Sequence, residues 1–238
     1  MLRRTASTNT LARGFLKALA GDELPLRPTL FLAFEQTAGR GRRGNSWQSP
    51  PGAGIYASLA LPLPSALRLE ALPLAVGIGL CRALNHWLGE GVCGLKWPND
   101  LMVAGQKLGG ILIEMPGSPE EEGPWAVIGF GINHRGELPA ANAVSLSRLL
   151  ADGPERRELV EGLIHALWQE LERAQDLPAT VVRYQAHSVL RPGQSLQCRL
   201  QGQVLEGRFR GFDEHGYLLL ETQAGLARLS TGEVIENG

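Results

Sequence analysis

The sequence contains few of the residues that hold small secreted domains together or bind zinc. Only three of its 238 residues are cysteines, Cys81, Cys93 and Cys198, and no two of them have the C-x-x-C spacing. The five histidines show no H-x-x-x-H spacing either. These absences argue against a disulfide framework and a thiolate zinc site, and they suit a reducing compartment. We therefore expect a cytoplasmic protein.

The sequence also lacks a strong net charge and a long uninterrupted apolar run. Its formal net charge is -1, so it has no overall basic field of the kind that attracts nucleic acid. Residues 1–5 lack the apolar core of a signal peptide. The longest apolar region, residues 59–80, is broken by prolines and charged side chains and is therefore no membrane span. We expect neither DNA nor a membrane as a partner.

Helix and strand patterns are mixed through the first 188 residues. Apolar and β-branched runs predict strands, and apolar residues at helical spacing predict helices. The predicted strands cover residues 29–35, 54–61, 107–114 and 125–133, with a short one from Gly94 to a turn at 98–100, and the predicted helices cover residues 10–19, 72–88, 155–175 and 178–188. Residues 116–124, which include three glutamates, are predicted to form an exposed loop.

The pattern changes at Arg191-Pro192-Gly193. From there the chain consists of short alternating strands separated by turn signals such as Gly202 and residues 213–216. This is the pattern of a small β-barrel of roughly 50 residues, a size at which a domain is marginal alone. We expect a domain boundary near residue 188, with the barrel over residues 189–238 leaning on the larger domain.

The most informative stretch is the loop Gly39-Arg40-Gly41-Arg42-Arg43-Gly44, called the Arg loop below. It follows the predicted strand 29–35. Glycine exposes backbone N–H groups, and arginine adds a permanent charge with a fixed fork of donors. Together they predict a cradle for an anion, most simply a phosphate. A solvated surface loop is the alternative.

The Arg loop resembles two well-known phosphate motifs but fits neither. It matches G-x-G-x-x-G, yet the fingerprint needs a helix to begin at the third glycine, and the continuation to Gly52 contains paired prolines. The spacing also imitates a Walker loop, but Asn45 stands where the lysine belongs, and the helix is again missing. The missing helix also argues against a nicotinamide oxidoreductase.

Other candidate binding residues lie where predicted strands meet turns. Lys96 and Lys107 add positive charge, Asp100 adds a carboxylate that could hold Mg²⁺, and Asn133 adds an amide. An ATP-using reaction needs such a set: cations for a polyphosphate, an acid for the metal and an amide for the base. Ser7-Thr8-Asn9 precedes a helical pattern, and by itself this stretch reads as a helix N-cap.

These motifs, in this order, resemble the biotin protein ligase family. The resemblance rests on Ser7-Thr8-Asn9, the Arg loop with Trp47 behind it, Lys96-Trp97-Pro98-Asn99-Asp100, Lys107-Leu108-Gly109-Gly110-Ile111 and Gly129-Phe130-Gly131-Ile132-Asn133. It spans the chain from Ser7 to the C-terminal barrel. The Arg loop followed by Lys-Trp-Pro-Asn-Asp is its most specific part.

The resemblance implies a fold and a two-step reaction. The fold is α+β: a mixed β-sheet with flanking helices, similar to the catalytic domain of class II aminoacyl-tRNA synthetases, over residues 1–188, then an SH3-like barrel over 189–238. In the first step biotin's carboxylate attacks the α-phosphate of ATP, giving biotinyl-5′-AMP and pyrophosphate. A lysine of a biotin carboxyl carrier protein then takes the biotinyl group. Mg²⁺ is the implied cofactor.

The resemblance also implies roles for individual residues. Arg40, Arg42 and Lys107 would be catalytic, lying along the carboxylate and the α-phosphate. The biotin-binding set would be Ser7, Thr8, Asn9, Gln36, Gly39, Arg40, Arg42, Lys107, Gly129 and Gly131. The nucleotide-binding set would be Arg43, Trp47, Lys96, Asn99, Asp100 and Asn133, with Asp100 on Mg²⁺. A core tryptophan is the alternative for Trp47, and a solvated neighbour is the alternative for Arg43.

Some family members carry an N-terminal winged helix that binds operator DNA. Here Ser7-Thr8-Asn9 falls at the start of the sequence, so we expect a monofunctional ligase without that domain. The sequence does not decide between a monomer and a homodimer. The rival interpretations are a lipoate or octanoyl transferase, which shares the catalytic fold, and a non-catalytic biotin-binding sensor. The retained Lys96, Asp100 and Lys107 argue against the sensor.

Overall fold

The structure is a computed structural model that describes residues 1–22, 24–117, 124–136 and 142–235. The central part of the loop predicted at 116–124 lies outside these ranges. The chain forms two compact units, each built from two separate stretches. The first comprises Met1–Leu67 and Gly105–Val160, and the second comprises Arg68–Ala104 and Glu161–Gly238.

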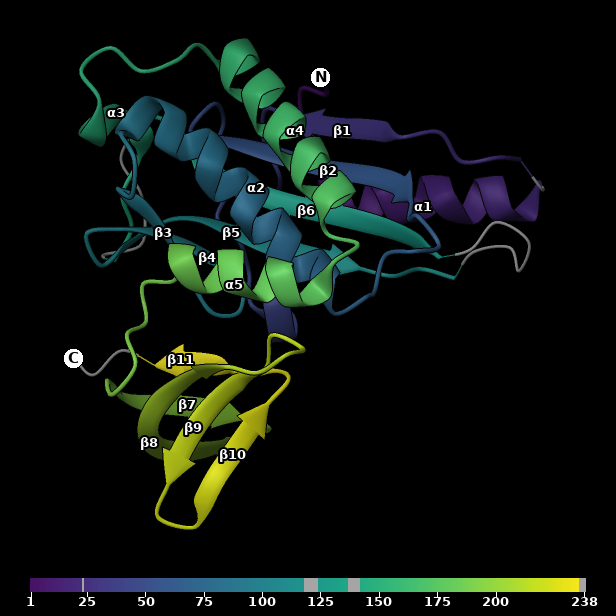
Figure 1. Ribbon diagram of the computed structural model, residues 1–238. Helices are drawn as coiled ribbons and strands as arrows, with labels where there is room; N and C mark the ends of the chain where they lie inside the picture. Colours follow the sequence, from purple (N-terminus) through teal and green to yellow (C-terminus); the bar gives the residue numbers. More distant parts are fainter. Residues whose placement is uncertain (23, 118–123, 137–141, 236–238) are drawn as a thin grey trace. The chain divides into compact units, whose positions relative to one another are not determined.

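The first unit is a sheet with a helix packed on it (Figure 1). Its strands are β1 (Thr29–Ala33), β2 (Gly54–Pro62), β5 (Gln106–Glu114) and β6 (Trp125–Asn133), and its helices are α1 (Thr8–Gly21), the 3-10 turn η1 (Arg42–Gly44) and the short α3 (Leu146–Leu149). The strands follow the order β1-β2-β6-β5, and every neighbouring pair is antiparallel. The strands therefore lie where the sequence predicts them.

The core of the first unit forms where α1 meets the sheet. Ala12 and Leu16, one turn apart on α1, pack against Ala60 of β2 and against Trp125 and Val127 of β6. All nine residues of β6 are buried. A strand buried on both faces reads as a continuous apolar run, which is why residues 125–133 are recognisable from sequence.

The second unit contains the remaining helices and a second sheet. Its elements are α2 (Ala71–Leu88), β3 (Cys93–Lys96), β4 (Asp100–Val103), α5 (Leu177–His187), β7 (Ser195–Leu200), β8 (Gln203–Phe212), β9 (Leu218–Thr222), β10 (Gly225–Leu229) and β11 (Glu233–Ile235). Helix α4 (Arg156–Arg173) begins in the first unit and continues into the second. The five C-terminal strands form an antiparallel sheet in the order β10-β9-β8-β7-β11.

A buried ion-pair cluster joins three helices of the second unit. Glu170 of α4 is fully buried, and its two oxygens accept from Arg82 of α2 at 3.2 Å and from Arg183 of α5 at 2.7 Å. Both arginines come from helices that pack together, so the carboxylate is paired on both sides. In the same unit, the rings of Tyr184 and Phe212 meet edge to face at 5.2 Å. The C-terminal sheet therefore packs against α5.

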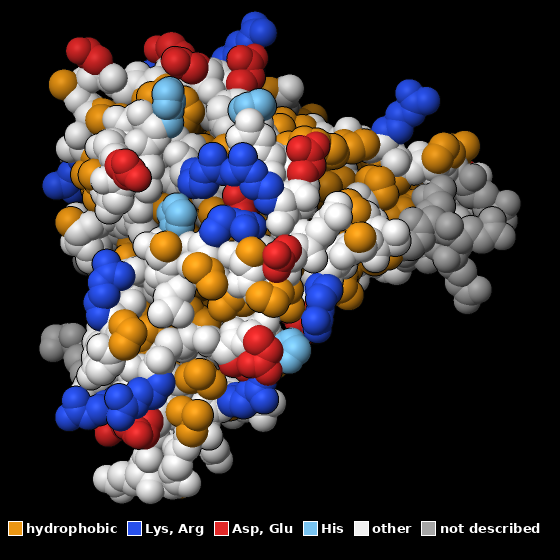
Figure 2. Space-filling model, in the orientation of Figure 1, with side chains coloured by type: hydrophobic (Ala, Val, Ile, Leu, Met, Phe, Trp, Pro, Cys, Tyr) orange, Lys and Arg blue, Asp and Glu red, His pale blue; other side chains and the backbone are white. Residues whose placement is uncertain are grey.

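On the face shown in Figure 2, basic (blue) and acidic (red) side chains both occur in several separate places. Among the helices that the structure describes, none is both long and apolar enough to cross a membrane.

Candidate active site

A buried polar network begins at the first turn of α1. Ser7 occupies the N-cap position, but its side chain makes no capping hydrogen bond, and Leu11 N–H donates to its carbonyl instead. Thr8 Oγ1 donates to Gln36 Oε1 at 3.1 Å, and Thr8 N–H donates to the same atom at 2.8 Å. Ser58 Oγ lies 2.8 Å from Thr8 Oγ1. Ser7 therefore occupies the N-cap position, as predicted, but without a side-chain cap, and the Thr8 side chain bonds with Gln36 and Ser58.

The network continues from Thr8 to the end of β5. Ser58 Oγ donates to Asn9 Oδ1 at 2.5 Å, and Asn9 Nδ2 donates to Glu114 Oε2 at 2.9 Å. Asn9 is only 4% exposed. Glu114 in turn contacts Arg40 of the Arg loop at 3.1 Å. Ser58 and Glu114 were not predicted from the sequence, and both connect residues that were.

The other end of the network reaches the segment that follows the Arg loop. Gln36 Nε2 donates to Ser49 Oγ at 2.8 Å, and Ser49 Oγ donates to the carbonyl of Trp47 at 3.2 Å. A Cβ at Gly39 would collide with that carbonyl and lie 2.7 Å from Ser49 Oγ. Glycine is therefore required at position 39 by close approach of the backbone.

The Arg loop is a hairpin rather than an extended coil. Gly41 N–H donates to Asn45 O at 2.7 Å, and Trp47 N–H donates to Gly39 O at 2.9 Å. At its tip, Arg43 has φ 55°, the left-handed region that side chains avoid. Arg40, Arg42 and Arg43 all belong to this hairpin, and Arg40 contacts Glu114.

Glycines of β5 and β6 form the floor under Trp47. Gly110 and Gly131 face each other across the two strands. A Cβ on Gly131 would lie 2.5 Å from the Trp47 ring, and one on Gly110 would lie 3.1 Å from it. Lys107 Nζ lies 5.5 Å from the centre of the same ring. Trp47 thus covers a glycine surface beside a cation.

Two further predicted residues lie on β6, Gly129 near its middle and Asn133 at its end. A Cβ on Gly129 would collide with the Asn9 amide, so the helix and the strand touch only because this position is glycine. Asn133, which is buried, donates from Nδ2 to the carbonyl of Lys107 at 3.1 Å. The first unit therefore brings together thirteen predicted residues: Ser7, Thr8, Asn9, Gln36, Gly39, Arg40, Arg42, Arg43, Trp47, Lys107, Gly129, Gly131 and Asn133.

The other three predicted residues lie in the second unit. Lys96, Asn99 and Asp100 belong to the hairpin of β3 and β4, and Lys96 pairs with Asp100 across it. All three are half-buried. Within the described ranges, no three His, Cys, Asp or Glu side chains group closely enough to hold a metal ion. Any metal here would therefore take few ligands from the protein.

Arg156 supports the segment that follows the Arg loop. Its guanidinium donates to the carbonyls of Gly54 and Gly52 at 2.6 and 2.7 Å and lies 5.8 Å from the centre of the Phe34 ring. Tyr56 Oη donates to the carbonyl of Pro50 at 3.0 Å, and burial raises the pKa of Tyr56 to about 12. These contacts, unrecognisable in the sequence, hold the backbone next to Ser49.

Replacing Arg156 by glutamine is expected to destabilise the protein. Two backbone carbonyls lose a charged donor, and each such hydrogen bond contributes about 1.5–3 kcal/mol. We expect a loss of roughly 3 kcal/mol or more in the free energy of unfolding, measured by urea titration. Arg148→Gln, at an exposed position of α3, is the matched control and should change stability by less than about 0.5 kcal/mol. Equal stability of the two variants would contradict this support.

His134 makes the stability of the protein depend on pH. It is buried at 3% exposure, Nε2 lies 3.1 Å from the carbonyl of Pro154, and burial lowers the pKa of its ring from the usual 6.5. The unfolded state therefore binds a proton at a higher pH than the folded state does. Stability should be complete above about pH 6.5 and fall as the pH decreases below it.

This dependence can be measured by urea unfolding between pH 7.5 and 5. His134→Asn keeps a donor and does not titrate, so its curve should be flatter than that of the unchanged protein. His86→Asn removes an exposed histidine and serves as the control. Parallel curves for the unchanged protein and His134→Asn would show that this ring does not set the dependence.

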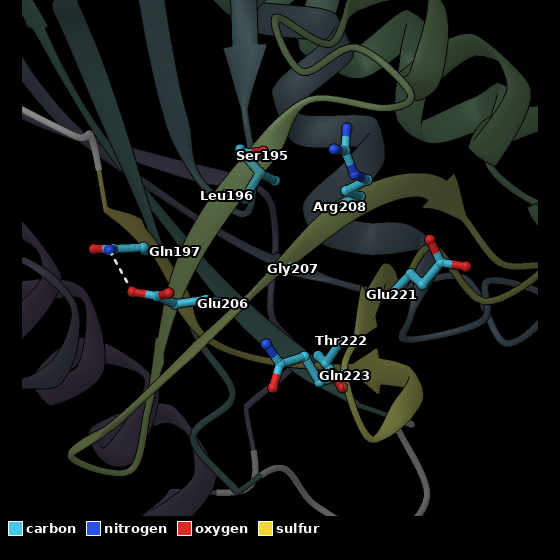
Figure 3. A pocket seen from close by; sticks show the side chains of 9 residues that line it. All are labelled: Ser195, Leu196, Gln197, Glu206, Gly207, Arg208, Glu221, Thr222 and Gln223. Carbon is cyan, nitrogen blue, oxygen red and sulfur yellow. Dashed lines mark hydrogen bonds between the residues drawn. The ribbon is translucent and has the colours of Figure 1, made fainter.

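The structure also contains an open hollow of about 460 Å³ in the C-terminal sheet (Figure 3). Polar side chains of β7, β8 and β9 line it, and Gln197 donates to Glu206 at 2.6 Å across it. None of the residues predicted from the sequence lines this hollow. It is therefore a feature separate from the candidate site.

Comparison with known proteins identifies the family. Residues 1–133 match the sequence model of the biotin/lipoate A/B protein ligase family, and residues 193–235 match that of the biotin protein ligase C terminal domain. The chain belongs to the biotin/lipoate A/B protein ligase family.

Individual relatives resemble the chain along its whole length. Biotin–[acetyl-CoA-carboxylase] ligase of Paracoccus denitrificans is 31% identical, and the match covers 100% of both chains. The Mycobacterium tuberculosis ligase of the same name is 29% identical, covering 99% of this chain and 87% of that one. The structure of biotin protein ligase from Aquifex aeolicus in complex with biotin and ATP has a TM-score of 0.79 at 25% identity, covering 98% of this chain and 96% of that one.

Proposed function

We propose that this protein is an ATP-dependent biotin protein ligase, which forms biotinyl-5′-AMP and transfers the biotinyl group to a lysine of a biotin carboxyl carrier protein. Family membership alone is compatible with either biotin or lipoate as the substrate. The observation that favours biotin is the buried network from Ser49 through Gln36, Thr8 and Ser58 to Asn9. A lipoyl ring has no hydrogen-bonding group for this network, whereas the ureido ring of biotin has a carbonyl and two N–H groups.

The ureido ring would bind at the first turn of α1. Ser7, Thr8 and Asn9, which are buried, and Gln36, which is half-buried, supply hydroxyl, amide and carbonyl groups. A buried polar group that a ligand leaves unpaired costs about 1–3 kcal/mol. Ligands without the ureido group would therefore bind far more weakly. Gly39, Gly129 and Gly131 allow the close approach that such a pocket requires.

The Arg loop and Lys107 would serve the first chemical step. A carboxylate oxygen of biotin attacks the α-phosphorus of ATP, the bond to the bridging oxygen breaks, and pyrophosphate leaves. Both reactants are anions, so the protein must offset their repulsion and the charge of the transition state. Arg40, Arg42 and Lys107 would do so as preorganised cations, while Trp47 and the glycine floor exclude water.

The family resemblance assigns six residues to the nucleotide. Asn133 is proposed for the adenine, Lys96, Asn99 and Asp100 for the phosphates, and Arg43 and Trp47 for the rest of the nucleotide. A single carboxylate suits Mg²⁺, which keeps waters and takes one or two carboxylates together with substrate phosphates. Asp100 would hold the ion, and bound Mg²⁺ would neutralise phosphate charge.

In the second step the carrier's lysine amine attacks the carbonyl carbon of the mixed anhydride, AMP leaves, and the amine loses a proton. We propose that residues 1–188 perform both steps and that residues 189–238 form an SH3-like barrel. The match of residues 193–235 to the ligase C-terminal domain supports this boundary. A cytoplasmic location is proposed from the free, buried cysteines.

The decisive experiment is transfer of labelled biotin to a purified carrier domain in the presence of ATP and Mg²⁺. We expect incorporation that depends on ATP and vanishes when the acceptor lysine is replaced by arginine. Calorimetric titration should show binding of biotin and none of lipoate. Lipoate binding without biotin binding would instead indicate a lipoate ligase, and absence of transfer with tight biotin binding would indicate a sensor.

A further inference from the structure

Glu114 joins the two halves of the candidate site. It is the last residue of β5, where it pairs with Val127 of β6, and its side chain is 18% exposed. Its carboxylate receives three side chains: Asn9 and Arg13 of α1 and Arg40 of the Arg loop. One acid on a rigid strand thus contacts both the proposed ureido pocket and the proposed anion cradle.

The carboxylate fixes the direction of the Asn9 amide. Asn9 Nδ2 donates to Glu114 Oε2 at 2.9 Å and to the carbonyl of Leu112 at 3.1 Å. Asn9 Oδ1 accepts from Ser58 Oγ at 2.5 Å. Both amide hydrogens are therefore directed at acceptors, and the oxygen has a second lone pair with which to accept an N–H of a ligand.

The same carboxylate fixes the direction of Arg40. Arg40 Nη1 lies 3.1 Å from Glu114 Oε1 and donates to Oε2 at 3.1 Å. The Arg40 side chain is 40% exposed, so this ion pair adds little to stability. Its effect is on geometry: a guanidinium has five N–H donors in a rigid fork, and anchoring one nitrogen aims the rest.

We infer that Glu114 is a positioning residue for biotin activation, which sets Asn9 and Arg40 in fixed relation so that a ligand held by its ureido ring presents its carboxylate to the Arg loop. The inference rests on the proposed function. An acid beside an anion cradle repels the substrate carboxylate. If Glu114 acted only as an opposing charge, removing its charge would speed biotin activation. If it positions Asn9 and Arg40, removing its charge slows biotin activation.

The test is a double-mutant cycle on the rate of biotinyl-AMP formation in a single turnover at saturating biotin and ATP. Glu114→Gln keeps the shape and removes the charge. We expect it to slow this step roughly tenfold or more, and Arg40→Gln to do at least as much. At saturating biotin the contact of Glu114 with Asn9 does not limit the rate, and Glu114 acts on this step through Arg40, so the double variant should be no slower than Arg40→Gln alone. Arg13→Gln, which removes the third partner of Glu114, should stay within about twofold of the unchanged protein.

Glu114→Asp is a second variant, which keeps the charge but shortens the reach. Positioning predicts that it is slowed like Glu114→Gln, whereas an effect of charge alone predicts the unchanged rate. A faster Glu114→Gln, or losses that multiply in the double variant, would overturn the inference while leaving the proposed function intact. Failure of the unchanged protein to form any biotinyl-AMP would overturn both.

Discussion

Gly129→Ala is expected to weaken biotin binding strongly. A Cβ at this position would collide with the Asn9 amide, which contacts Ser58 and Glu114 as well. Asn9 would have to move, and its displacement would break the network at its centre. Since several buried hydrogen bonds depend on that amide, we expect biotin affinity to fall by about 100-fold or more, equivalent to at least 2.7 kcal/mol.

The measurement is a calorimetric titration with biotin, accompanied by thermal unfolding. Gly14→Ala is the matched control, because Gly14 lies in α1 with nothing within 4 Å of an added Cβ. That change should leave affinity unaltered and stabilise the helix slightly, by about 0.5–1 kcal/mol. A folded Gly129→Ala protein that binds biotin normally would show that Asn9 does not contribute to biotin binding.

Arg42→Gly is expected to release biotinyl-AMP that it still makes. Arg42 lies at the start of η1, in the tip of the Arg loop hairpin. Replacing it by glycine removes one cation from the closed site and adds backbone freedom where the loop must seal the adenylate. We expect synthesis to continue and the release rate to rise by about 100-fold, since one charged hydrogen bond is worth about 1.5–3 kcal/mol.

Retention can be followed by mass spectrometry of protein-bound and free biotinyl-AMP after gel filtration. Arg27→Gly, an exposed change outside the loop, is the control and should retain the adenylate normally. Undiminished retention by Arg42→Gly would contradict the sealing role of the loop. Trypsin cleavage within the Arg loop that biotin and ATP fail to reduce would contradict it independently.

The elements of the fold could be predicted because their apolar patterns are strong. β6 occupies Trp125–Asn133, as predicted, since a strand buried along its whole length reads as one apolar run. The short α3 was missed, because four residues are too few for a helical period to show. The assembly of α2, β3 and α5 with the C-terminal sheet in one compact unit was also missed, because it joins segments far apart in the chain.

The site was only partly predictable for the same reason. Gly39 to Gly44 form a local motif, so the Arg loop is visible in the sequence. Glu114 contacts Asn9 from 105 positions away in the sequence, and Ser58 contacts it from 49 positions away. No local sequence pattern indicates such long-range contacts. The sequence left two interpretations for Trp47: a residue that covers the ligand or a tryptophan of the hydrophobic core. Its ring lies on Gly110 and Gly131 beside Lys107, so the sheet glycines explain why a bulky ring fits there.

The most direct test of the account is a crystal structure of the protein with biotin and ATP. We expect the ureido ring to bond with Thr8, Asn9 and Gln36, and the carboxylate and α-phosphate to lie between the Arg loop and Lys107. Ligands bound elsewhere, with Arg40, Arg42 and Lys107 all turned to solvent, would contradict the claim that these cations bring two anions together.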